Sequence, residues 1–480
     1  MTQMQLTKSD FLTFRHCSKS LWLQKRKPEA VIFPAPSLFD QLLMQDGYRV
    51  EAVVKELVST WQDANSCQFQ VTFQSLDGLF ARADLVRDCG GGEIDLYEIK
   101  GSTSLKSSTG QDHIDDAAFQ QLVAERAGYK VRDVYVIHVQ KDYVREGSIN
   151  PARFLNIVNV TNESASRMAA IARDADAALK LLAMEAIDER GCSCRRIGNT
   201  DNHCASFSYF NPDVPEKSVY LLPRISKARL DAFLSEGRMS LAEIEPTELT
   251  RLQVPVLLAA KRDEPVVNIE GIKQFLNELT WPLHFYDYET FASAIPLSDG
   301  LKPQQKVPVQ YSMHKLHRDG QLEHFESLTE RPGEQRQLLD RLMADCDLIG
   351  SLIAWNMSFE KSCNDTLAGL FPDAALFLQD LNARTVDLMD VFKEDYVDIR
   401  FKGSTSIKKV LPVICPHLQY NEDAVHDGGG AMAAWLTMIE TDDDEARGRL
   451  SRELRAYCEL DSLAMVEIFR FLNVLVDGQD

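Results

Sequence analysis

Two carboxylates lie two positions apart in the apolar, aromatic segment HFYDYETF, residues 284–291. Alternate residues of a strand point to the same side, so Asp287 and Glu289 would share one small patch of surface. Like charges held that close are unfavourable unless a cation lies between them. The segment therefore predicts either an edge strand with its acids in water or one wall of a divalent-cation site.

Further acids that could complete such a site occur later in the chain. The segment LIGSLIAWNMSFEKSC predicts an apolar strand, a turn at Asn356 and a helix that begins near Glu360. In RELRAYCELDSLAMVEIF the apolar residues follow helical spacing, and Tyr457 and Asp461 fall on one helix face. Such acids could hold two divalent cations, which clamp the attacking and leaving oxygens of a phosphodiester. Tyr457 could then orient the attacking water.

The order D-x-E, N-x-x-F-E and Y-x-x-x-D resembles the DnaQ-type 3′→5′ exonuclease superfamily, in the subgroup with a tyrosine in its last motif. The resemblance covers about 281–475 and implies an RNase H-like fold and a site that uses Mg²⁺ or Mn²⁺. It implies that Tyr457 positions water and that four acids are metal ligands, namely Asp287, Glu289, Glu360 and Asp461. The superfamily usually has Asp where this chain has Glu360, so the metal geometry and the rate stay open.

A second group of chemically competent residues lies in the first half. Asp84 falls in the strand-like ARADLV, and Glu98 and Lys100 alternate along LYEIKG and so face the same way. Thirteen residues separate Asp84 from Glu98, which suits a hairpin that brings them together. Two acids and a lysine can hydrolyse a phosphodiester, because the acids hold Mg²⁺ or Mn²⁺ and the lysine stabilises charge on the phosphate or activates water.

This arrangement resembles the PD-(D/E)XK nuclease fold of RecB-type enzymes, although the Pro before the first Asp is absent. The resemblance implies a restriction-endonuclease-like core in which a later helix often carries a glutamine, here Gln120 or Gln121 in AAFQQL. It also implies a further metal ligand from an upstream helix, and Glu51 in MQDGYRVEAVV is the candidate.

The ten cysteines are expected to be thiols, since the N-terminal segment lacks the apolar core of a secretory signal. Cys17 precedes the nuclease-like region, and Cys192, Cys194 and Cys204 follow it. This pattern resembles iron–sulfur nucleases of the AddB and CRISPR-adaptation type, and it implies a [4Fe–4S] cluster that pins the two ends of the domain together. Zinc is the alternative, since it also accepts four thiolates. Four unrelated buried thiols are a third interpretation.

Two α/β halves are expected to position these residues. A RecB-like domain is expected over 1–210, with a helix over 35–60, a glycine turn at CGGGE and a helix over 161–190 capped by Asn162 or Ser164. Residues 211–280 contain helical stretches broken by prolines and are expected to form a helical connector. A DnaQ-like domain is expected over 281–480.

The composition bounds the classes of function. With 480 residues, 45% apolar and 26% charged, the chain should form two to four globular domains. No apolar run approaches the roughly 20 residues of a membrane span, so we expect a cytoplasmic protein without a membrane partner. The net charge of −20 argues against an indiscriminate nucleic-acid coat but permits a nuclease with local basic patches, such as KSLWLQKRK and RFKGSTSIKK.

Together the two halves resemble a bacterial family that fuses a RecB-like module to a DnaQ-like module. The resemblance implies a metal-dependent nuclease that acts on DNA, single-stranded or at ends, in DNA repair or in defence against foreign DNA. An RNA-directed exonuclease is one alternative. A nucleic-acid-binding scaffold with one inactive site is another, and Glu360 in the usual Asp position is the residue that motivates it.

Overall fold

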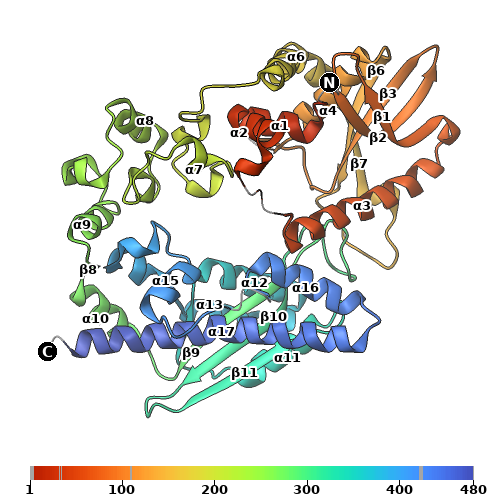
Figure 1. Cartoon of the computed structure of the whole chain (residues 1–480). Helices are drawn as coiled ribbons and strands as arrows, with labels where there is room; N and C mark the ends of the chain where they lie inside the picture. The colour runs from red at the N-terminus through yellow and green to blue at the C-terminus, as the bar shows by residue number, and fades with distance from the viewer. Residues whose placement is uncertain (1–4, 32, 34, 109–110, 421–424, 479–480) are drawn as a thin grey trace. The chain divides into compact units, whose positions relative to one another are not determined.

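The computed structural model describes residues 5–31, 33, 35–108, 111–420 and 425–478, and the chain divides into two α/β units (Figure 1). The first unit comprises Met1–Pro36, Asp40–Asp213 and Ser293–Gln304. The second comprises Ser37–Phe39, Val214–Ala292 and Gln305–Asp480. Most of the expected connector thus clusters with the second unit, while a short segment of the expected DnaQ-like domain clusters with the first.

The first unit contains a mixed five-stranded sheet in the order β1-β2-β3-β6-β7, with bounds β1 Cys67–Gln74, β2 Phe80–Gly90, β3 Glu93–Lys100, β6 Lys130–Val139 and β7 Leu155–Asn159. β2 and β3 are antiparallel, and the turn between them is built from Gly90, Gly91 and Gly92, which all have positive φ. Glycine adopts that conformation without a Cβ clash. β3 and β6 are parallel, and helix α4 (His113–Arg126) makes the crossover between them. The predicted hairpin that carries Asp84 and Glu98 is confirmed.

Helices supply two apolar cores for this sheet. One core includes residues of α1 (Lys8–His16), α2 (Ser18–Arg26), α4 and α6 (Thr161–Ala183), and the other includes α3 (Leu38–Ser59). The prediction that Asn162 or Ser164 caps α6 is wrong, because the helix begins at Thr161 and Val160 precedes it without a side-chain cap. Ser164 is buried instead and donates a hydrogen bond of 2.6 Å to Gln121 Oε1, so its hydroxyl serves helix packing.

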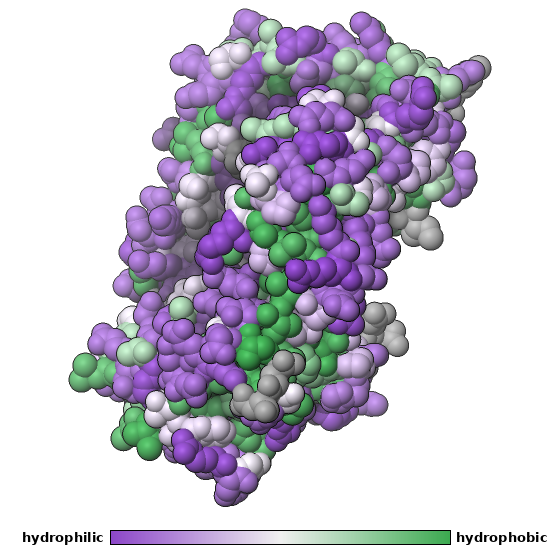
Figure 2. All heavy atoms as spheres, turned by 90° about the vertical axis from the view of Figure 1, so that its left-hand side faces the viewer, coloured by the Kyte–Doolittle hydropathy of each residue, from purple (hydrophilic) through white to green (hydrophobic). Residues whose placement is uncertain are grey.

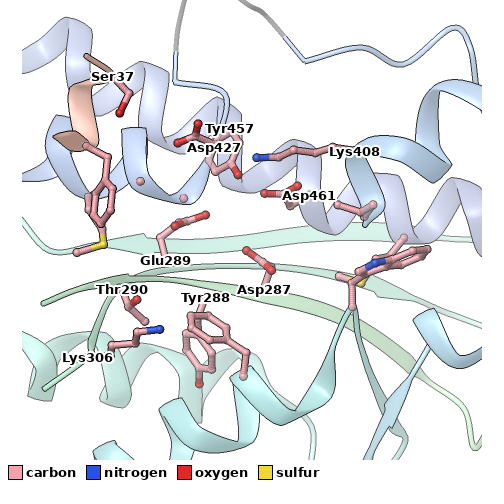
Figure 3. A pocket seen from close by; sticks show the side chains of 18 residues that line it. Ser37, Asp287, Tyr288, Glu289, Thr290, Lys306, Lys408, Asp427, Tyr457 and Asp461 are labelled. Atoms are coloured by element: carbon pink, nitrogen blue, oxygen red, sulfur yellow. The ribbon is translucent and has the colours of Figure 1, made fainter. Parts of the chain in front are cut away.

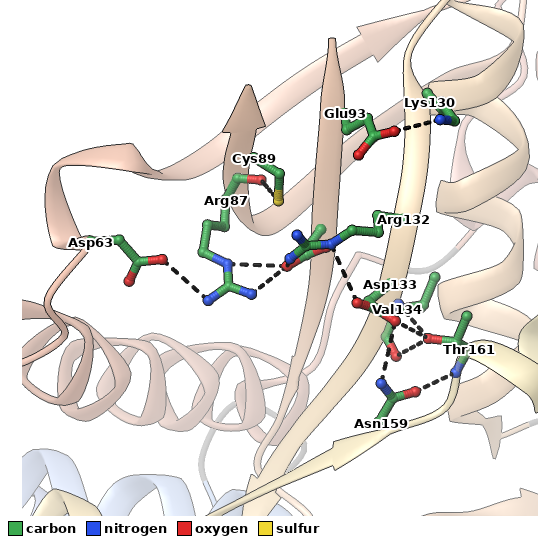
Figure 4. Close-up of polar contacts among 11 residues, drawn as sticks. Asp63, Arg87, Cys89, Glu93, Lys130, Arg132, Asp133, Val134, Asn159 and Thr161 are labelled. Carbon is green, nitrogen blue, oxygen red and sulfur yellow. Dashed lines mark hydrogen bonds and ion pairs between the residues drawn. The ribbon is translucent and has the colours of Figure 1, made fainter. Parts of the chain in front are cut away.

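The buried carboxylate of Asp95 links three strands of the first sheet, and Figure 4 labels Arg87 and Arg132, the two arginines that contact it. Asp95 on β3 has 0% exposure, and it accepts hydrogen bonds of 2.5–3.0 Å from Arg87 on β2 and Arg132 on β6. Burial alone would raise the pKa of Asp95, but the two guanidinium groups outweigh it and lower the pKa. A buried charge that lost one of these partners would be strongly unfavourable, so the three residues favour one strand register.

The second unit contains a mixed five-stranded sheet in the order β11-β10-β9-β12-β13, with bounds β9 Leu283–Phe291, β10 Val307–Leu316, β11 Leu322–Leu328, β12 Ser351–Ala354 and β13 Thr385–Asp387. The central strand β9 is antiparallel to β10 and parallel to β12. Leu283 and Phe285 share a core with helix α17 (Asp444–Asp477), whereas Tyr286 and Tyr288 share one with helices α11 (Gln335–Asp345), α12 (Met357–Leu370) and α13 (Ala375–Arg384). By this alternation Asp287 and Glu289 face α17.

Residues of the expected connector contribute to the structure of the second unit. Ile272 of helix α10 (Ile269–Glu278) lies fully buried in the core that contains Phe285, and β8 (Val266–Val267) pairs with β14 (Tyr396–Val397). The remaining strands and α-helices are β4 Ser107–Ser108, β5 Gln111–Asp112, α5 Pro151–Phe154, α7 Phe207–Phe210, α8 Lys227–Ser235, α9 Val254–Arg262, α14 Met389–Glu394, α15 Ile407–Ile414 and α16 Gly428–Glu440.

The surface agrees with the charged composition. Figure 2 shows a face on which hydrophilic residues predominate and hydrophobic residues gather in limited areas. Within the part of the chain that the structure describes, no helix combines the length and the apolar character that crossing a bilayer requires.

Candidate functional site

Three acids that the sequence singled out converge in the second unit (Figure 3). Asp287 and Glu289 extend from β9 and Asp461 from α17, and each offers an oxygen within 4.8 Å of the others. We call these three residues the acid cluster. Glu289 and Asp461 are only 8% and 7% exposed, and the cluster lines a pocket of about 560 Å³ that also contains Tyr457. The predicted strand and helix therefore bring these acids together.

Burial raises the pKa of each member of the acid cluster, and neighbouring carboxylates raise it further for Asp287 and Glu289. Burial acts first on Asp287, and the nearby Asp461 and Glu289 raise its pKa further, well above the ordinary value. Burial and Asp461 raise the pKa of Glu289 to about 8, and burial raises that of Asp461 to about 6. Among the described residues, none of the three forms an ion pair with a lysine or arginine. A bound divalent cation would supply the missing positive charge.

Glu360 lies beside the acid cluster rather than within it. It belongs to the first turn of α12, is 1% exposed, and its Oε2 atom has no hydrogen-bond partner among the residues that the structure describes. Burial raises its pKa to about 8, and Glu360 in turn raises the pKa of Asp287. The predicted turn is present, since Asn356 has a left-handed backbone with φ of 73°. Asp387 fixes the helix start by accepting the Asn356 N–H at 2.9 Å.

Two residues next to the acid cluster were missed by the sequence analysis. Tyr420 donates a hydrogen bond of 2.5 Å from its hydroxyl to Asp461 Oδ1. Lys408 lines the pocket, and its ammonium lies 5.7 Å and 5.3 Å from the ring centres of Tyr420 and Tyr457. The basic segment RFKGSTSIKK contains Lys408 and was the available signal, but no spacing rule connected it to the acids.

The acids should make the metal-free protein less stable as the pH rises. Unfolded carboxyls release their protons near pH 4, whereas folded Glu289 and Glu360 keep theirs up to about pH 8. The folded state therefore binds more protons between these values, and the free energy of unfolding falls with increasing pH. In chelator we expect a loss of more than about 2 kcal/mol from pH 5 to pH 8, measured by urea unfolding. Glu360→Gln should show a smaller loss, and an equal slope in wild type and variant would contradict the assignment.

In the first unit the structure brings together Asp84, Glu98, Lys100 and Gln120. Lys100 Nζ lies 2.7 Å from Glu98 Oε1, and the Gln120 side-chain amide donates to Glu98 Oε2. Lys8 of α1, which the sequence analysis missed, also lies 2.8 Å from Glu98 Oε1. Burial would raise the pKa of Glu98, but Lys8 and Lys100 outweigh it and lower it to about 2. Glu98 thus already has its counter-charges.

Asp84 has a further contact with the strand that carries Glu98, whereas Glu51 has other neighbours. Asp84 accepts the Ile99 N–H at 2.8 Å, and burial and Glu98 raise its pKa to about 7. Glu51 contacts Gln70 at 2.6 Å and Lys55 at 2.7 Å, and among the described residues it has no recorded contact with Asp84 or Glu98. The described residues also provide no third metal-ligating side chain that groups with these two acids within 4.8 Å.

The four predicted cysteines form one cluster in the first unit. Cys17 lies between α1 and α2, and its sulfur lies within 4.8 Å of those of Cys192, Cys194 and Cys204. Three of the four are at most 9% exposed. Cys17 lowers the pKa of the Cys192 thiol, and Asn211 donates a hydrogen bond of 3.3 Å to the same sulfur. This cluster can bind a metal ion or an iron–sulfur cluster.

Similarity to known proteins covers part of the chain. Residues 284–406 match the family described as "Domain of unknown function (DUF2779)". That segment includes Asp287, Glu289 and Glu360 but ends before Tyr457 and Asp461.

Two curated relatives come from mycoplasmas. The "Uncharacterized protein MG366 homolog" of Mycoplasma pneumoniae is 26% identical over 280 residues, which cover 52% of this chain and 41% of the relative. The "Uncharacterized protein MG366" of Mycoplasma genitalium is 24% identical over 232 residues, which cover 43% of this chain and 34% of the relative. The matched part is therefore less than half of each relative's length. These names describe no reaction, so the chemistry must be argued from the residues.

Proposed function

We propose that the chain is a metal-dependent nuclease whose second unit is a DnaQ-like 3′→5′ exonuclease of RNase H-like fold that acts on DNA. One observation carries this proposal: Asp287, Glu289 and Asp461 converge in a pocket beside Tyr457, and none of the three has an ion pair with a described lysine or arginine. Carboxylate oxygens are the ligands that Mg²⁺ and Mn²⁺ prefer. The same elements that the resemblance implies, a central strand, a helix start and a late helix, carry the four acids.

The acid cluster fits a divalent-cation site, with Glu360 and its unpartnered oxygen as a fourth acid nearby. Bound there, the cations would stabilise charge on the scissile phosphate and acidify the attacking water. Tyr457 would orient that water, and the Lys408 ammonium would attract a phosphate oxygen. A pocket of about 560 Å³ is in the size range of small-ligand sites, so it favours a strand end over a duplex.

The test of the proposal is product analysis on single-stranded substrates labelled at the 3′ or the 5′ end. With Mg²⁺ or Mn²⁺ we expect mononucleotides to be released from the 3′ end of DNA, and no release in chelator. If the protein clearly prefers RNA of the same sequence, RNA takes the place of DNA as the proposed substrate. Salt-sensitive binding without any metal-dependent product would instead support the scaffold interpretation.

The two tyrosines beside Asp461 should contribute differently. Tyr457→Phe removes the hydroxyl proposed to orient water, so kcat should fall by about 100-fold with little change in KM. Tyr420→Phe removes a hydrogen bond to Asp461 and should mainly weaken metal binding, which appears as a higher Mg²⁺ requirement. Single-turnover rates measured over a range of Mg²⁺ concentrations separate the effects. The roles are reversed if Tyr420→Phe shows the larger loss at saturating Mg²⁺.

We further propose a RecB-like PD-(D/E)XK catalytic module in the first unit. The contacts of Glu98 with Lys100 and Gln120 support it. Here Asp84 and Glu98 would be the acids that hold the metal, and Lys100 would stabilise the phosphate charge. Because two lysines already neutralise Glu98, this module should need a higher metal concentration for activity than the acid cluster. Lys100→Ala should abolish a product other than the mononucleotides released from the 3′ end. An unchanged product pattern would argue against a second active site.

For the cysteine cluster we propose a bound metal centre with four thiolate ligands. The resemblance implies a [4Fe–4S] cluster. The four sulfurs, however, all lie within 4.8 Å of one another, a limit that admits the roughly 3.8 Å edge of a tetrahedron around one zinc ion, given Zn–S bonds of about 2.3 Å. An iron–sulfur cluster is larger than one ion, so it would require the four sulfurs to move apart.

A further inference from the structure

Two histidines and a glutamate form another group of metal-ligating side chains in the second unit. His314 on β10 and His324 on β11 are cross-strand partners, and their stacked rings have centroids 4.5 Å apart. Glu459 extends from α17, and one ligand atom from each residue lies within 4.8 Å of the others. We call these three residues the histidine site. None of them belongs to the acid cluster or to the residues assigned to the proposed nuclease.

Two buried serines connect the imidazoles through a chain of hydrogen bonds. Ser462 Oγ lies 2.8 Å from His314 Nδ1 and 2.7 Å from Ser312 Oγ, and Ser312 Oγ lies 2.9 Å from His324 Nε2. Ser462 also donates to the backbone carbonyl of Glu459 at 3.1 Å. A carbonyl only accepts, so that bond uses the single hydroxyl proton of Ser462.

The direction of every other bond in the chain follows from that donation. Ser462 must accept from His314 Nδ1–H and from the Ser312 hydroxyl, because it has no second proton to give. Ser312 has then used its own proton and must accept from His324 Nε2–H. Each ring therefore carries its proton on the nitrogen that faces a serine. The bare nitrogens are His314 Nε2 and His324 Nδ1, and the latter lies 3.8 Å from Glu459 Oε1.

A nitrogen lone pair and a carboxylate that face each other repel, and a cation between them would turn this repulsion into attraction. We propose that His314, His324 and Glu459 bind one divalent transition-metal ion, with zinc as the preferred ion. Two imidazoles and a carboxylate are a common zinc ligand set, and serines that hold the opposite ring nitrogens orient such ligands. Magnesium and calcium prefer oxygen ligands, so the histidine site would discriminate against them.

The position of the site suits an ion that joins secondary-structure elements. His314 is 3% exposed and would be a fixed ligand, whereas the side chains of His324 and Glu459 are 25% and 48% exposed and leave a path for the ion and a water. The ion would connect β10 and β11 to α17, the helix that also carries Tyr457 and Asp461. It would thereby stabilise the position of α17 on the sheet, independently of whether the proposed nuclease reaction occurs.

The test is the zinc content of the full chain after dialysis against buffered free zinc, with excess Mg²⁺ present to occupy the acid cluster. Glu459→Gln and His324→Ala should each bind one zinc ion fewer than wild type, with an affinity at least about 100-fold weaker. Ser312→Ala keeps all three ligands and should weaken binding by about 10–100-fold. His317→Ala is the matched control, because His317 lies in the same hairpin and pairs with Glu323 at 2.9 Å without a second histidine in its group.

A proton on His324 is the competing cation, since a charged imidazole would also pair with Glu459. In that case wild type, Glu459→Gln and His317→Ala would contain the same amount of zinc, and the proposal would be overturned. Glu459 is exposed, so this variant is informative even if His324→Ala fails to fold.

Discussion

Asp287→Asn should abolish the release of mononucleotides from the 3′ end while the protein stays folded. Asp287 lies between two further acids, and the amide that replaces it cannot take the negative charge that holds a cation. Loss of a second-sphere partner typically weakens a metal site by 10–100-fold, so loss of this ligand should lower kcat/KM by more than about 100-fold. End-labelled single-stranded DNA with saturating Mg²⁺ measures this loss directly.

The same substitution should stabilise the metal-free protein. Burial and the neighbouring carboxylates raise the pKa of Asp287, so an uncharged amide removes repulsion that the folded state otherwise carries. Urea unfolding in chelator at pH 8 should therefore give Asp287→Asn a higher free energy of unfolding than wild type. Glu323→Gln, on the edge strand β11, is the control and should change neither quantity. An active Asp287→Asn would rule out the acid cluster as the catalytic site, whatever its effect on stability.

The parts of the site that follow from strand and helix periodicity could be predicted from the sequence. Asp287 and Glu289 share a face because β9 alternates, and Tyr457 and Asp461 share a pocket because they are four positions apart on α17. In the first half, Asp84 and Glu98 meet because a glycine turn folds their strands into a hairpin.

The residues that sequence reasoning missed reach the sites through tertiary folding alone. Lys8 lies 90 residues before Glu98, and Tyr420 lies 41 residues before Asp461, with no repeat or spacing that relates them. Glu51 shows the converse, because its residue type and its helix suit a metal ligand, yet its contacts are with Gln70 and Lys55. Local periodicity determines which face a residue occupies, but it does not determine which distant helix covers that face.

The division into units was the least accessible feature of the fold. The segment 211–280 has many prolines and charges and therefore resembled a linker, yet Ile272 within it is fully buried in the core of the second unit. Residues 293–304 cluster with the first unit although they follow β9 directly. A short segment that clusters with another unit than its sequence neighbours leaves no periodic signal, because a few backbone and side-chain contacts are sufficient to hold it.

Cys204→Ala should remove the metal from the cysteine cluster and destabilise the first unit. The three later cysteines lie more than 170 residues after Cys17, so a shared metal would close a long loop between α2 and the segment after α6. A cross-link over more than about 100 residues contributes about 5 kcal/mol in the loop-entropy account. For a unit of about 200 residues that loss lowers Tm by about 10–20 °C, which differential scanning calorimetry measures.

Anaerobic purification followed by iron and zinc analysis determines which centre is present. About four iron atoms per chain would support the iron–sulfur assignment. One zinc ion beyond that proposed for the histidine site would support a tetrahedral ion held by the four sulfurs. Cys89→Ala is the matched control, since Cys89 lies in the first unit outside the cluster and should retain both the metal and the Tm. If Cys204→Ala also retains them, Cys204 is not a metal ligand and the proposed four-thiolate centre does not stabilise the first unit.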